Sequence, residues 1–373
     1  MLEQIKGNLK NIIGWKTRRR IVVFSIDDYG NVRIGSREAL SNLEKAGLRL
    51  GRFDQIDALE TRQDLEGMLE TLASVEDMNG NNAVLTPFAV PCNIDYEKMA
   101  EDKYQVYYYE MLPKTFEKLA VKDPEEYGGA WKLWQEGIER GLLVPQFHGR
   151  EHFNMKIFEE KLAKRDPELI ASLKNNSNPG LNNMNYETIQ YTAAFEFWDF
   201  ADNERFKEII VDGLNAFEAV FGYRSIHFNA PCGSQHHVIH ETLRKNGIKY
   251  IDNPLLKKEH QGFGKYKTIL NYTGKEDEDG LIYQVRNVVF EPTLYGGTNW
   301  VNYAMQQIST AFRWNRPAII SSHRANFCGH IEPGNRKQGL IYMKELLKRI
   351  KDKWPDVEFM SANQLGDLIA SGK

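Results

Sequence analysis

The stretch Ile21-Val22-Val23-Phe24-Ser25-Ile26-Asp27-Asp28-Tyr29-Gly30 decides the fold class of this chain. Its apolar, β-branched run predicts a fully buried strand over 21–26, which is typical of a parallel sheet. The run ends in two adjacent carboxylates, Asp27 and Asp28. Active sites lie at the carboxyl ends of the strands in barrels of parallel strands. These two side chains are therefore candidate catalytic residues.

A second apolar run, over 142–147, leads directly into His148, and His152 follows four residues later. One carboxylate and two imidazoles are sufficient to hold a divalent metal ion with coordination positions left for water. The other carboxylate would lie beside that water as a general base. Each motif alone has an ordinary structural explanation, as a turn or helix cap or as a solvated helix face. Together they predict a metal-dependent hydrolase.

Predicted strands and helices alternate along the whole chain, which indicates an α/β fold with a mostly parallel sheet. Strands are predicted over 21–26, 83–90, 142–147, 225–228, 249–252, 281–290, 318–322 and 357–360. Helices are predicted over 36–46, 62–76, 107–119, 126–140, 205–221, 237–246, 301–314, 338–351 and 365–369. No segment rich in Gly, Pro or Ser divides the chain. We expect residues 1–373 to form a single domain, with a long helical insertion at about 53–140 between the first and third strands.

Composition excludes several classes of protein. The formal net charge of -3 argues against nucleic-acid binding, which favours basic patches. Three widely spaced cysteines predict a reducing compartment without a disulfide framework. The first ten residues lack the apolar core of a signal peptide, and no apolar run is long enough to span a membrane. These features predict a cytoplasmic location.

Four motifs occur in a recognisable order: Asp27-Asp28, His148-x-x-x-His152, Ala230-Pro231-Cys232-Gly233 and Ser321-Ser322-His323. In this order the chain resembles the polysaccharide deacetylases, the NodB-homology proteins of carbohydrate esterase family 4, over roughly residues 20–370. The resemblance implies a single distorted (β/α)7 barrel of about seven strands. It also implies one divalent metal ion, zinc first and cobalt or nickel as alternatives, and hydrolysis of an N-acetyl or O-acetyl group on a sugar.

The resemblance also implies a role for each residue of these motifs. Asp27 would be the base, Asp28, His148 and His152 the metal ligands, and His323 the general acid. The backbone N–H of Cys232 would help to hold the oxyanion. Pro231 in the same motif, and Trp300 in a loop that contains two glycines, are candidate substrate contacts.

The chain departs from the family pattern in three places. Asn229 stands where the family has an arginine that braces the base, and Arg150 or Arg324 is the expected replacement. Ser321 stands where a leucine lines the acetyl pocket. The first and second motifs are 120 positions apart (148 minus 28), which is wider than usual. Near the fourth motif, Asp252 is expected to orient His323.

Two further readings stay open. One is a metal-independent glycosidase that uses paired carboxylates. The other is a glycan-binding protein of the same fold with a vestigial site, which the missing arginine favours. The leading reading is a deacetylase acting on an acetylated sugar, an oligosaccharide or a glycan precursor. The insertion would complete the substrate cleft or form the contact of a homo-oligomer.

Overall fold

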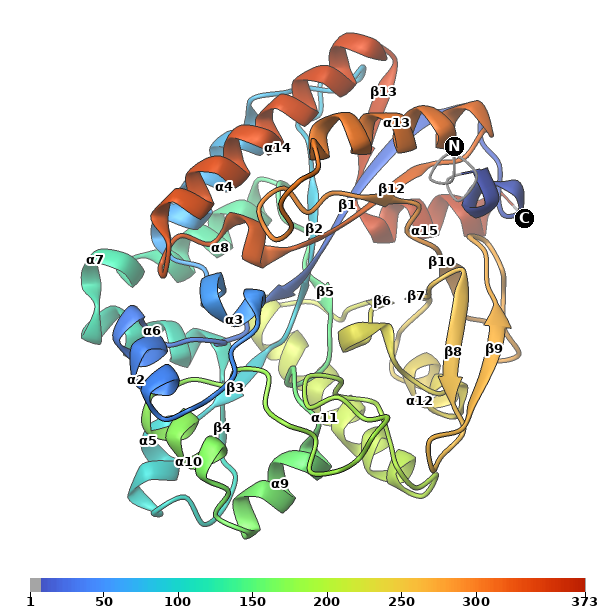
Figure 1. Ribbon diagram of the computed structural model, residues 1–373. Helices are drawn as coiled ribbons and strands as arrows, with labels where there is room; N and C mark the ends of the chain where they lie inside the picture. Colours follow the sequence, from blue (N-terminus) through green and yellow to red (C-terminus); the bar gives the residue numbers. More distant parts are fainter. Residues whose placement is uncertain (1–7, 373) are drawn as a thin grey trace.

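The computed structural model describes residues 8–372, and Figure 1 shows that part of the chain built around one large sheet. The first seven residues, on which the predicted absence of a signal peptide partly depends, lie outside the described residues. Within the described chain the sheet has nine strands, and every ladder between them is parallel. They are β1 (Arg20–Tyr29), β2 (Leu85–Ala89), β5 (Gln146–Phe147), β6 (His227–Phe228), β7 (Tyr250–Asp252), β10 (Ile282–Gln284), β11 (Val288–Val289), β12 (Ala318–His323) and β13 (Val357–Met360).

Eight of these strands follow one another in the order β10-β7-β6-β5-β2-β1-β12-β11, and the sheet curls into an open half-barrel. The ninth strand, β13, pairs with the first residues of β1, while β2 pairs with the later ones. Among the described residues no ladder joins β10 to β11, so the barrel is not closed. The predicted α/β fold with a distorted barrel of parallel strands is confirmed.

The single strand predicted over 281–290 is wrong, because the chain leaves one edge of the sheet there and enters the other. β10 pairs with β7, whereas β11 pairs with β12. Asn287, directly before β11, holds the second segment against β12: its side-chain Oδ1 accepts the N–H of Ile319 at 2.8 Å, and its own N–H donates to the Ile319 carbonyl at 3.2 Å. The segment between the two strands thus bridges the open seam of the barrel.

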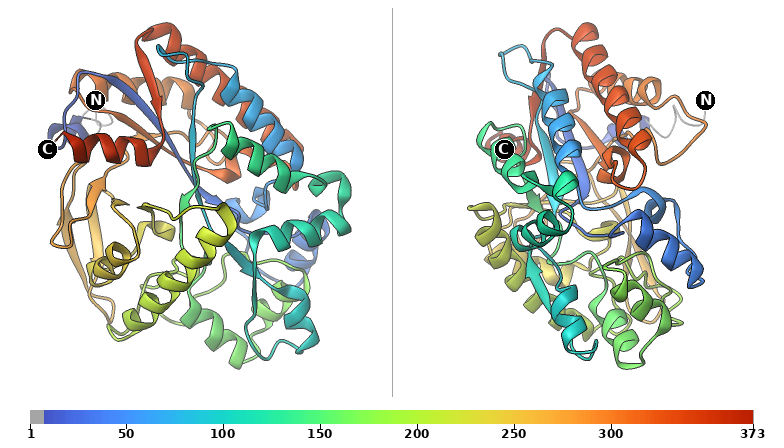
Figure 2. Two further views of the ribbon diagram at one scale, coloured as in Figure 1. Left: turned by 180° about the vertical axis from the view of Figure 1, so that it is seen from behind. Right: turned by 90° about the vertical axis from the view of Figure 1, so that its left-hand side faces the viewer.

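Helices pack around the curved sheet, as Figure 2 shows from two further directions. They are α2 (Arg37–Lys45), α3 (Arg52–Ile56), α4 (Arg62–Ala73), α5 (Tyr96–Glu101), α6 (Leu112–Lys122), α7 (Pro124–Tyr127), α8 (Ala130–Glu139), α9 (Met155–Ala163), α10 (Pro167–Lys174), α11 (Asp202–Phe221), α12 (His240–Lys245), α13 (Trp300–Arg313), α14 (Pro333–Lys353) and α15 (Ala362–Ser371). Two antiparallel hairpins lie apart from the main sheet: β3 (Cys92–Ile94) with β4 (Tyr109–Met111), and β8 (Leu256–His260) with β9 (Tyr266–Leu270).

The stretch 53–140 contains β2 of the main sheet and the hairpin β3–β4 as well as helices. The helix predicted over 107–119 begins later than expected, since residues 109–111 form β4 and α6 starts at Leu112. Pro113 lies in the first turn of α6, where its missing N–H leaves no intrahelical bond unmade. The pattern therefore placed the helix correctly but not its beginning.

Side chains alternate between the two faces of β1, and this alternation separates two cores. Val22, Phe24 and Ile26 pack beneath the outer helices. Ile21 and Val23 face the concave side, where they pack with α15. At Gly366 of α15, an added Cβ would collide with the ring of Tyr250, so the helix approaches the sheet closely there. The concave face beyond this core, toward the carboxyl ends of the strands, is left for polar side chains.

The three cysteines are free thiols, with Cys92 and Cys328 buried and Cys232 exposed. Among the described residues, no helix combines the length and the apolar character needed to span a bilayer.

Candidate metal centre and catalytic cleft

Asp27 and Asp28 both face the cleft, although neighbouring side chains on a regular strand point to opposite faces. Asp27 continues the concave-face series of β1 and lies in register with His323 of β12. Asp28 has a φ of 74°, and the ladder between β1 and β2 is irregular between Ile26 and Tyr29. This bulge turns the Asp28 side chain back toward the concave side. Both carboxylates consequently line one cleft of about 480 Å³.

Asp28, His148 and His152 meet in this cleft, and all three are buried. Asp28 Oδ1 lies 2.9 Å from Nε2 of His152 and 3.4 Å from Nε2 of His148. Burial opposes the charge of Asp28, but the His152 and His148 imidazoles hold its pKa well below the ordinary value. Burial also lowers the pKa of His152 from 6.5. At neutral pH the group is therefore one carboxylate with at least one neutral imidazole.

The hydrogen bonds of His148 suit a metal ligand. Its Nδ1 lies 2.7 Å from the carbonyl oxygen of Asn229, and because a carbonyl only accepts, Nδ1 must carry the proton. In the neutral ring Nε2 then holds a lone pair, and among the described residues this buried atom has no hydrogen-bond partner. A lone pair that faces a carboxylate and a second imidazole is favourable only with a cation between them. Asp28, His148 and His152 could thus hold a metal ion, since their ligand atoms lie within 4.8 Å of one another.

Asp27 is held by three hydrogen bonds from two residues. Arg286 donates to both carboxylate oxygens at 2.7 Å, and Asn229 Nδ2 donates to Oδ1 at 2.9 Å. The fork-shaped contact fixes both the position and the direction of the carboxylate. Asn229, which stands where an arginine was expected, therefore contacts Asp27 itself, and the guanidinium comes from the segment between β10 and β11.

The two arginines predicted to replace the missing guanidinium do not contact Asp27 but pair with other carboxylates, so that prediction is wrong. Arg150 donates to Glu151 and, at 2.7 Å, to Asp212 Oδ2 on α11. Arg324 is fully buried and pairs with Asp57 at 2.9 Å and Glu60 at 2.8 Å. Both arginines therefore pair with carboxylates outside the cleft.

His323 lines the same cleft as the candidate metal ligands, and its partner is Glu291 rather than the predicted Asp252. Its Nδ1 lies 2.7 Å from Glu291 Oε1, and Asn326 Nδ2 donates to the other Glu291 oxygen at 2.6 Å. Burial disfavours the imidazolium, but the Glu291 carboxylate outweighs it and raises the pKa of His323 to about 9. His323 is therefore protonated at neutral pH and can donate from its other nitrogen.

Asp252 occupies a different position because it lies on β7, at the far side of the open seam from β12. Its Oδ2 accepts from Nε of Arg286 at 2.6 Å, and its Oδ1 lies 2.9 Å from Nε2 of His227. Burial opposes its charge, but Arg286 and His227 lower its pKa. Asp252 thus orients the guanidinium that holds Asp27.

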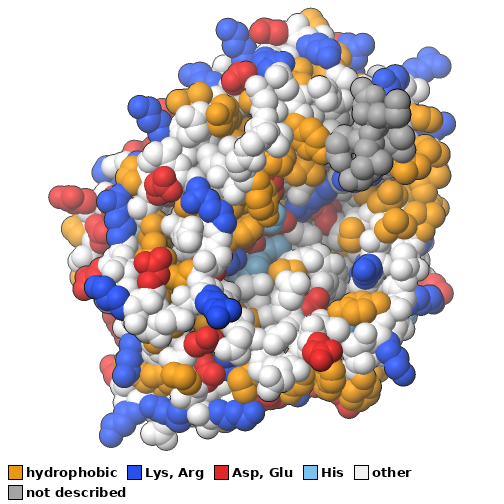
Figure 3. All heavy atoms as spheres, in the orientation of Figure 1, with side chains coloured by type: hydrophobic (Ala, Val, Ile, Leu, Met, Phe, Trp, Pro, Cys, Tyr) orange, Lys and Arg blue, Asp and Glu red, His pale blue; other side chains and the backbone are white. Residues whose placement is uncertain are grey.

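Figure 3 shows the cleft as a hollow in the face of Figure 1, with histidine side chains inside it. Cys232 lines it with a φ of 58°, next to Thr192. Of the predicted substrate contacts, Pro231 is buried and Trp300 donates its ring N–H to the Tyr295 carbonyl. Neither of the two is among the residues that line the cleft, whereas Tyr295 and Phe53 are.

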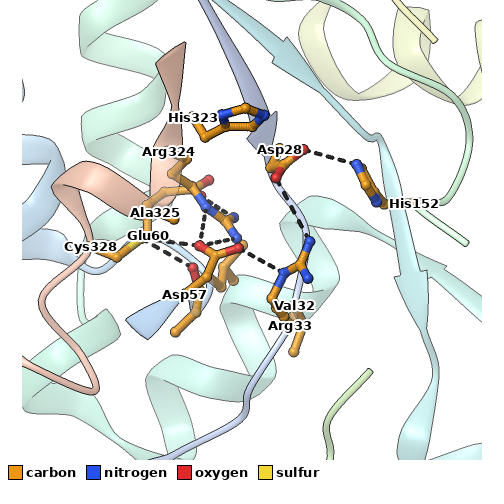
Figure 4. Close-up of polar contacts among 12 residues, drawn as sticks. Asp28, Val32, Arg33, Asp57, Glu60, His152, His323, Arg324, Ala325 and Cys328 are labelled. Carbon is orange, nitrogen blue, oxygen red and sulfur yellow. Dashed lines mark hydrogen bonds and ion pairs between the residues drawn. The ribbon is translucent and has the colours of Figure 1, made fainter. Parts of the chain in front are cut away.

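A buried ionic network lies behind Asp28, as Figure 4 shows. Arg33 extends from the loop after β1, and its guanidinium lies 3.8 Å from Asp28 Oδ2 and 3.1 Å from Asp57 Oδ2. Asp57 in turn accepts from Arg324. Because every buried charge in the network has an opposite charge beside it, the network fixes the loop that carries Arg33 relative to β12.

Comparison with known proteins gives similarity of structure only. No family model and no curated protein sequence matches the chain. A putative polysaccharide deacetylase from Mycobacterium smegmatis is 11% identical with a TM-score of 0.47, over 96% of this chain and 93% of the other. A putative glycoside hydrolase/deacetylase from Parabacteroides distasonis is 11% identical with a TM-score of 0.48, over 94% and 71%. Puue allantoinase is 13% identical with a TM-score of 0.43, over 95% and 91%. At this level the similarity does not fix a family.

The sequence pointed to the candidate metal ligands but not to Arg286, Glu291 or Arg33. Arg286 stands two residues beyond β10, inside the apolar run 281–290 that was predicted as one strand, and Glu291 stands two residues beyond β11, directly after that run. A charged residue in the middle of a buried strand was the available signal, because it requires a partner or an interruption of the strand.

Proposed function

We propose that this protein is a metal-dependent hydrolase that removes an acetyl group, N-linked or O-linked, from a carbohydrate or glycan precursor. The observation that carries the proposal is the arrangement of Asp28, His148 and His152, in which a buried lone pair faces a carboxylate. Zinc is the first candidate, because two imidazoles and one carboxylate with open positions are typical of catalytic zinc sites. A cytoplasmic location is part of the same proposal.

A divalent cation on these three residues would supply positive charge to a carbonyl oxygen and make bound water more acidic. Asp27 accepts the proton of the attacking water, and the Arg286 fork keeps its carboxylate aimed in one direction. The N–H of Cys232 is proposed to stabilise the negative charge that develops on the carbonyl oxygen. His323, protonated at neutral pH, donates its proton to the departing nitrogen or oxygen.

The cleft suits a substrate of one or two sugar rings. Its volume of about 480 Å³ lies at the lower end of the range for small-molecule sites. Phe53 and Tyr295 line it and offer aromatic faces on which a sugar ring can pack. Ser321 makes part of the wall polar, and its hydroxyl lies 3.4 Å from Arg286.

A metal-independent glycosidase needs a carboxylic acid with a raised pKa beside a second carboxylate. Asp27 and Asp28 do line the same cleft, but the pKa of Asp28 is lowered and Asp27 is held by a guanidinium. This electrostatic arrangement disfavours the protonated carboxylic acid that a glycosidase needs as its general acid. A vestigial glycan-binding protein would retain the same contacts without turnover, so the experiment must measure acetate release.

The decisive experiment combines elemental analysis with a screen of acetylated sugars. Protein purified without chelator should contain about one equivalent of zinc or another divalent transition metal. It should release acetate from at least one acetylated mono- or oligosaccharide. Asp27→Asn should keep the metal and lose turnover, whereas Asp212→Asn, a matched change on the outer helix α11, should retain both. Absence of metal after supplementation would refute the mechanism, and metal without acetate release would favour the glycan-binding reading.

A further inference from the structure

A row of polar side chains leads from the catalytic cleft into the interior of the protein. Arg286 donates to both oxygens of Asp27 at 2.7 Å and, through Nε, to Asp252 Oδ2 at 2.6 Å. The other oxygen of Asp252 lies 2.9 Å from Nε2 of His227. Asp27 and Arg286 are slightly exposed, with side chains 13% and 12% accessible, whereas His227 is fully buried. We call these four residues the Arg286 network.

The chemistry of Asp252 fixes the direction of the hydrogen bonds in this network. Burial opposes its charge, but Arg286 and His227 lower its pKa, so at neutral pH it is a carboxylate that only accepts. Nε2 of His227 therefore carries a proton and donates it to Oδ1. Without this N–H, Oδ1 would be a buried oxygen with no donor, which is costly. Among the described residues, the other donor to this carboxylate is Arg286.

The surroundings of His227 leave its ring no alternative partner. The Phe88 ring meets it edge to face with centroids 5.2 Å apart, and the Tyr250 ring lies at 5.8 Å. Phe88 also packs under the guanidinium of Arg286, at 5.1 Å. Nδ1 of His227 is buried and has no hydrogen-bond partner among the described residues. The bond to Asp252 thus lies in apolar surroundings, where hydrogen bonds to charged groups are strong.

Strand β6 reaches Asp27 by two routes. Asn229, directly after the strand, donates to Asp27 Oδ1 at 2.9 Å. His227, on the strand, reaches it through Asp252 and Arg286. In the sheet, β5 and β2 separate β6 from β1, so both routes cross the concave face (Figure 1). The direct route fixes one oxygen of Asp27, whereas the indirect route fixes the guanidinium that contacts both.

We propose that His227 is a positioning residue for the base: by donating to Asp252 Oδ1, it keeps the guanidinium of Arg286 available to both oxygens of Asp27. If the His227 N–H is lost, Asp252 draws the guanidinium toward itself and the fork on Asp27 weakens. His227 is not among the residues that line the cleft, so it acts through its neighbours. The assignment rests on the proposed function, because it takes Asp27 as the base.

Turnover in two backgrounds tests this role. His227→Phe keeps a ring beside Phe88 but removes the N–H, and kcat should fall about tenfold, within the usual coupling of residues in one hydrogen-bond network. KM and zinc affinity should stay unchanged. In an Arg286→Ala background the same substitution should cost little more, since the fork is already absent. His227→Gln, whose amide nitrogen can donate to the same oxygen, should recover most of the loss. Equal losses in both backgrounds, or no recovery with Gln, would overturn the proposal.

The matched control is His240→Phe. His240 is also buried and lies 2.7 Å, through Nδ1, from an aspartate oxygen, that of Asp277, but neither residue lines the cleft. This variant should leave kcat unchanged, and a tenfold loss here would show that removing any buried histidine of this kind lowers kcat, which would overturn the specific role of His227.

A second measurement needs neither substrate nor metal. The Nε–H signal of Arg286 in ¹⁵N NMR spectra, assigned by its absence in Arg286→Lys, should exchange slowly with water in the wild-type protein. It should shift and exchange faster in His227→Phe and return in His227→Gln. An unmoved signal would overturn the proposal. Absence of acetate release by the wild-type protein would instead refute the proposed function, so the two failures are distinguishable.

Discussion

Two clusters among the described residues contain two histidines and one carboxylate, and they differ in where the protons lie. Asp28, His148 and His152 form one of them, and His236, His237 and Glu259 form the other. In each cluster the ligand atoms lie within 4.8 Å of one another. Residue types and distances alone would assign a metal ion to both.

The positions of the protons in the second cluster disfavour metal binding. The N–H of Val238 donates to His236 Nδ1 at 3.1 Å, and burial lowers the pKa of His236 to about 4, so the ring is neutral and its proton lies on Nε2. That Nε2 lies 3.5 Å from Glu259 Oε2 and points a proton, not a lone pair, at the carboxylate. Lys257 already places an ammonium 3.5 Å from the other Glu259 oxygen. In both histidines Nδ1 is the ring nitrogen that points away from the carboxylate, and its contact differs: a carbonyl oxygen for His148 and an N–H for His236. This contact decides which cluster can bind a metal.

The largest effect should come from removing a ligand of the first cluster. His148→Ala should weaken zinc binding by more than about 100-fold, because even partners of metal ligands contribute about 10-fold to 100-fold. His237→Ala, the equivalent change in the second cluster, should leave zinc affinity unchanged. Elemental analysis and chelator competition measure both. Equal losses in the two variants would break the distinction between the clusters.

Asp27→Asn should lower the turnover number by about 10²-fold to 10⁴-fold, which is the usual contribution of a general base. The metal should remain bound, since Asp27 is not among the three ligands. Acetate release and metal content are measured on the same preparation. Loss of metal together with turnover would mean that Asp27 belongs to the metal centre instead.

Arg286→Ala should lower the turnover number by about 10-fold to 100-fold. Hydrogen bonds to a charged group contribute about 1.5–3 kcal/mol, and the variant removes the fork that aims Asp27. Arg286→Lys should recover part of the loss, because one ammonium cannot reproduce a two-point contact. Arg150→Ala is the control, since Arg150 contacts carboxylates outside the cleft. A change in zinc affinity as large as the change in turnover would argue for a purely structural role.

Glu291→Gln should give the smallest effect, visible mainly in the dependence on pH. His323 must be protonated to donate, so wild-type activity should decline as pH rises through about 9. Without the Glu291 charge the pKa of His323 falls, and the alkaline limb of the rate profile moves to lower pH. An unmoved limb would exclude His323 as the acid.

The same pair affects stability, and the sign follows from the raised pKa. A group whose pKa is higher in the folded state stabilises that state fully below its unfolded pKa of 6.5, and the contribution is lost as pH rises through about 9. Glu291→Gln should therefore destabilise the protein more below pH 6.5 than above pH 9. Urea unfolding of both proteins on either side of this window measures the difference.

The sequence predicted the residues that follow long apolar runs. Such a run indicates a buried strand, and the carboxyl ends of parallel strands lie at the same edge of a sheet. Asp28, His148 and His323 were found in this way. Their partners were not found. Arg286 lies inside the run 281–290 that was predicted as one strand, whereas the structure has two strands there, of three and two residues. Glu291 directly follows that run and was not singled out. The bulge at Asp28 was equally hidden, since nothing in the letters Asp-Asp fixes a positive φ.

The contacts of Asp27 have a consequence for the order in which the protein matures. Its two partners lie 202 and 259 positions further along the chain, whereas all three candidate metal ligands are present once residue 152 has been synthesised. Contacts between distant positions form late, because the loop that they close must first be ordered. We expect a growing chain to contain all three candidate ligands well before Asn229, whose carbonyl contacts His148 Nδ1 and whose amide holds Asp27. The capacity to bind the ion and the hold on Asp27 would thus both depend on residue 229.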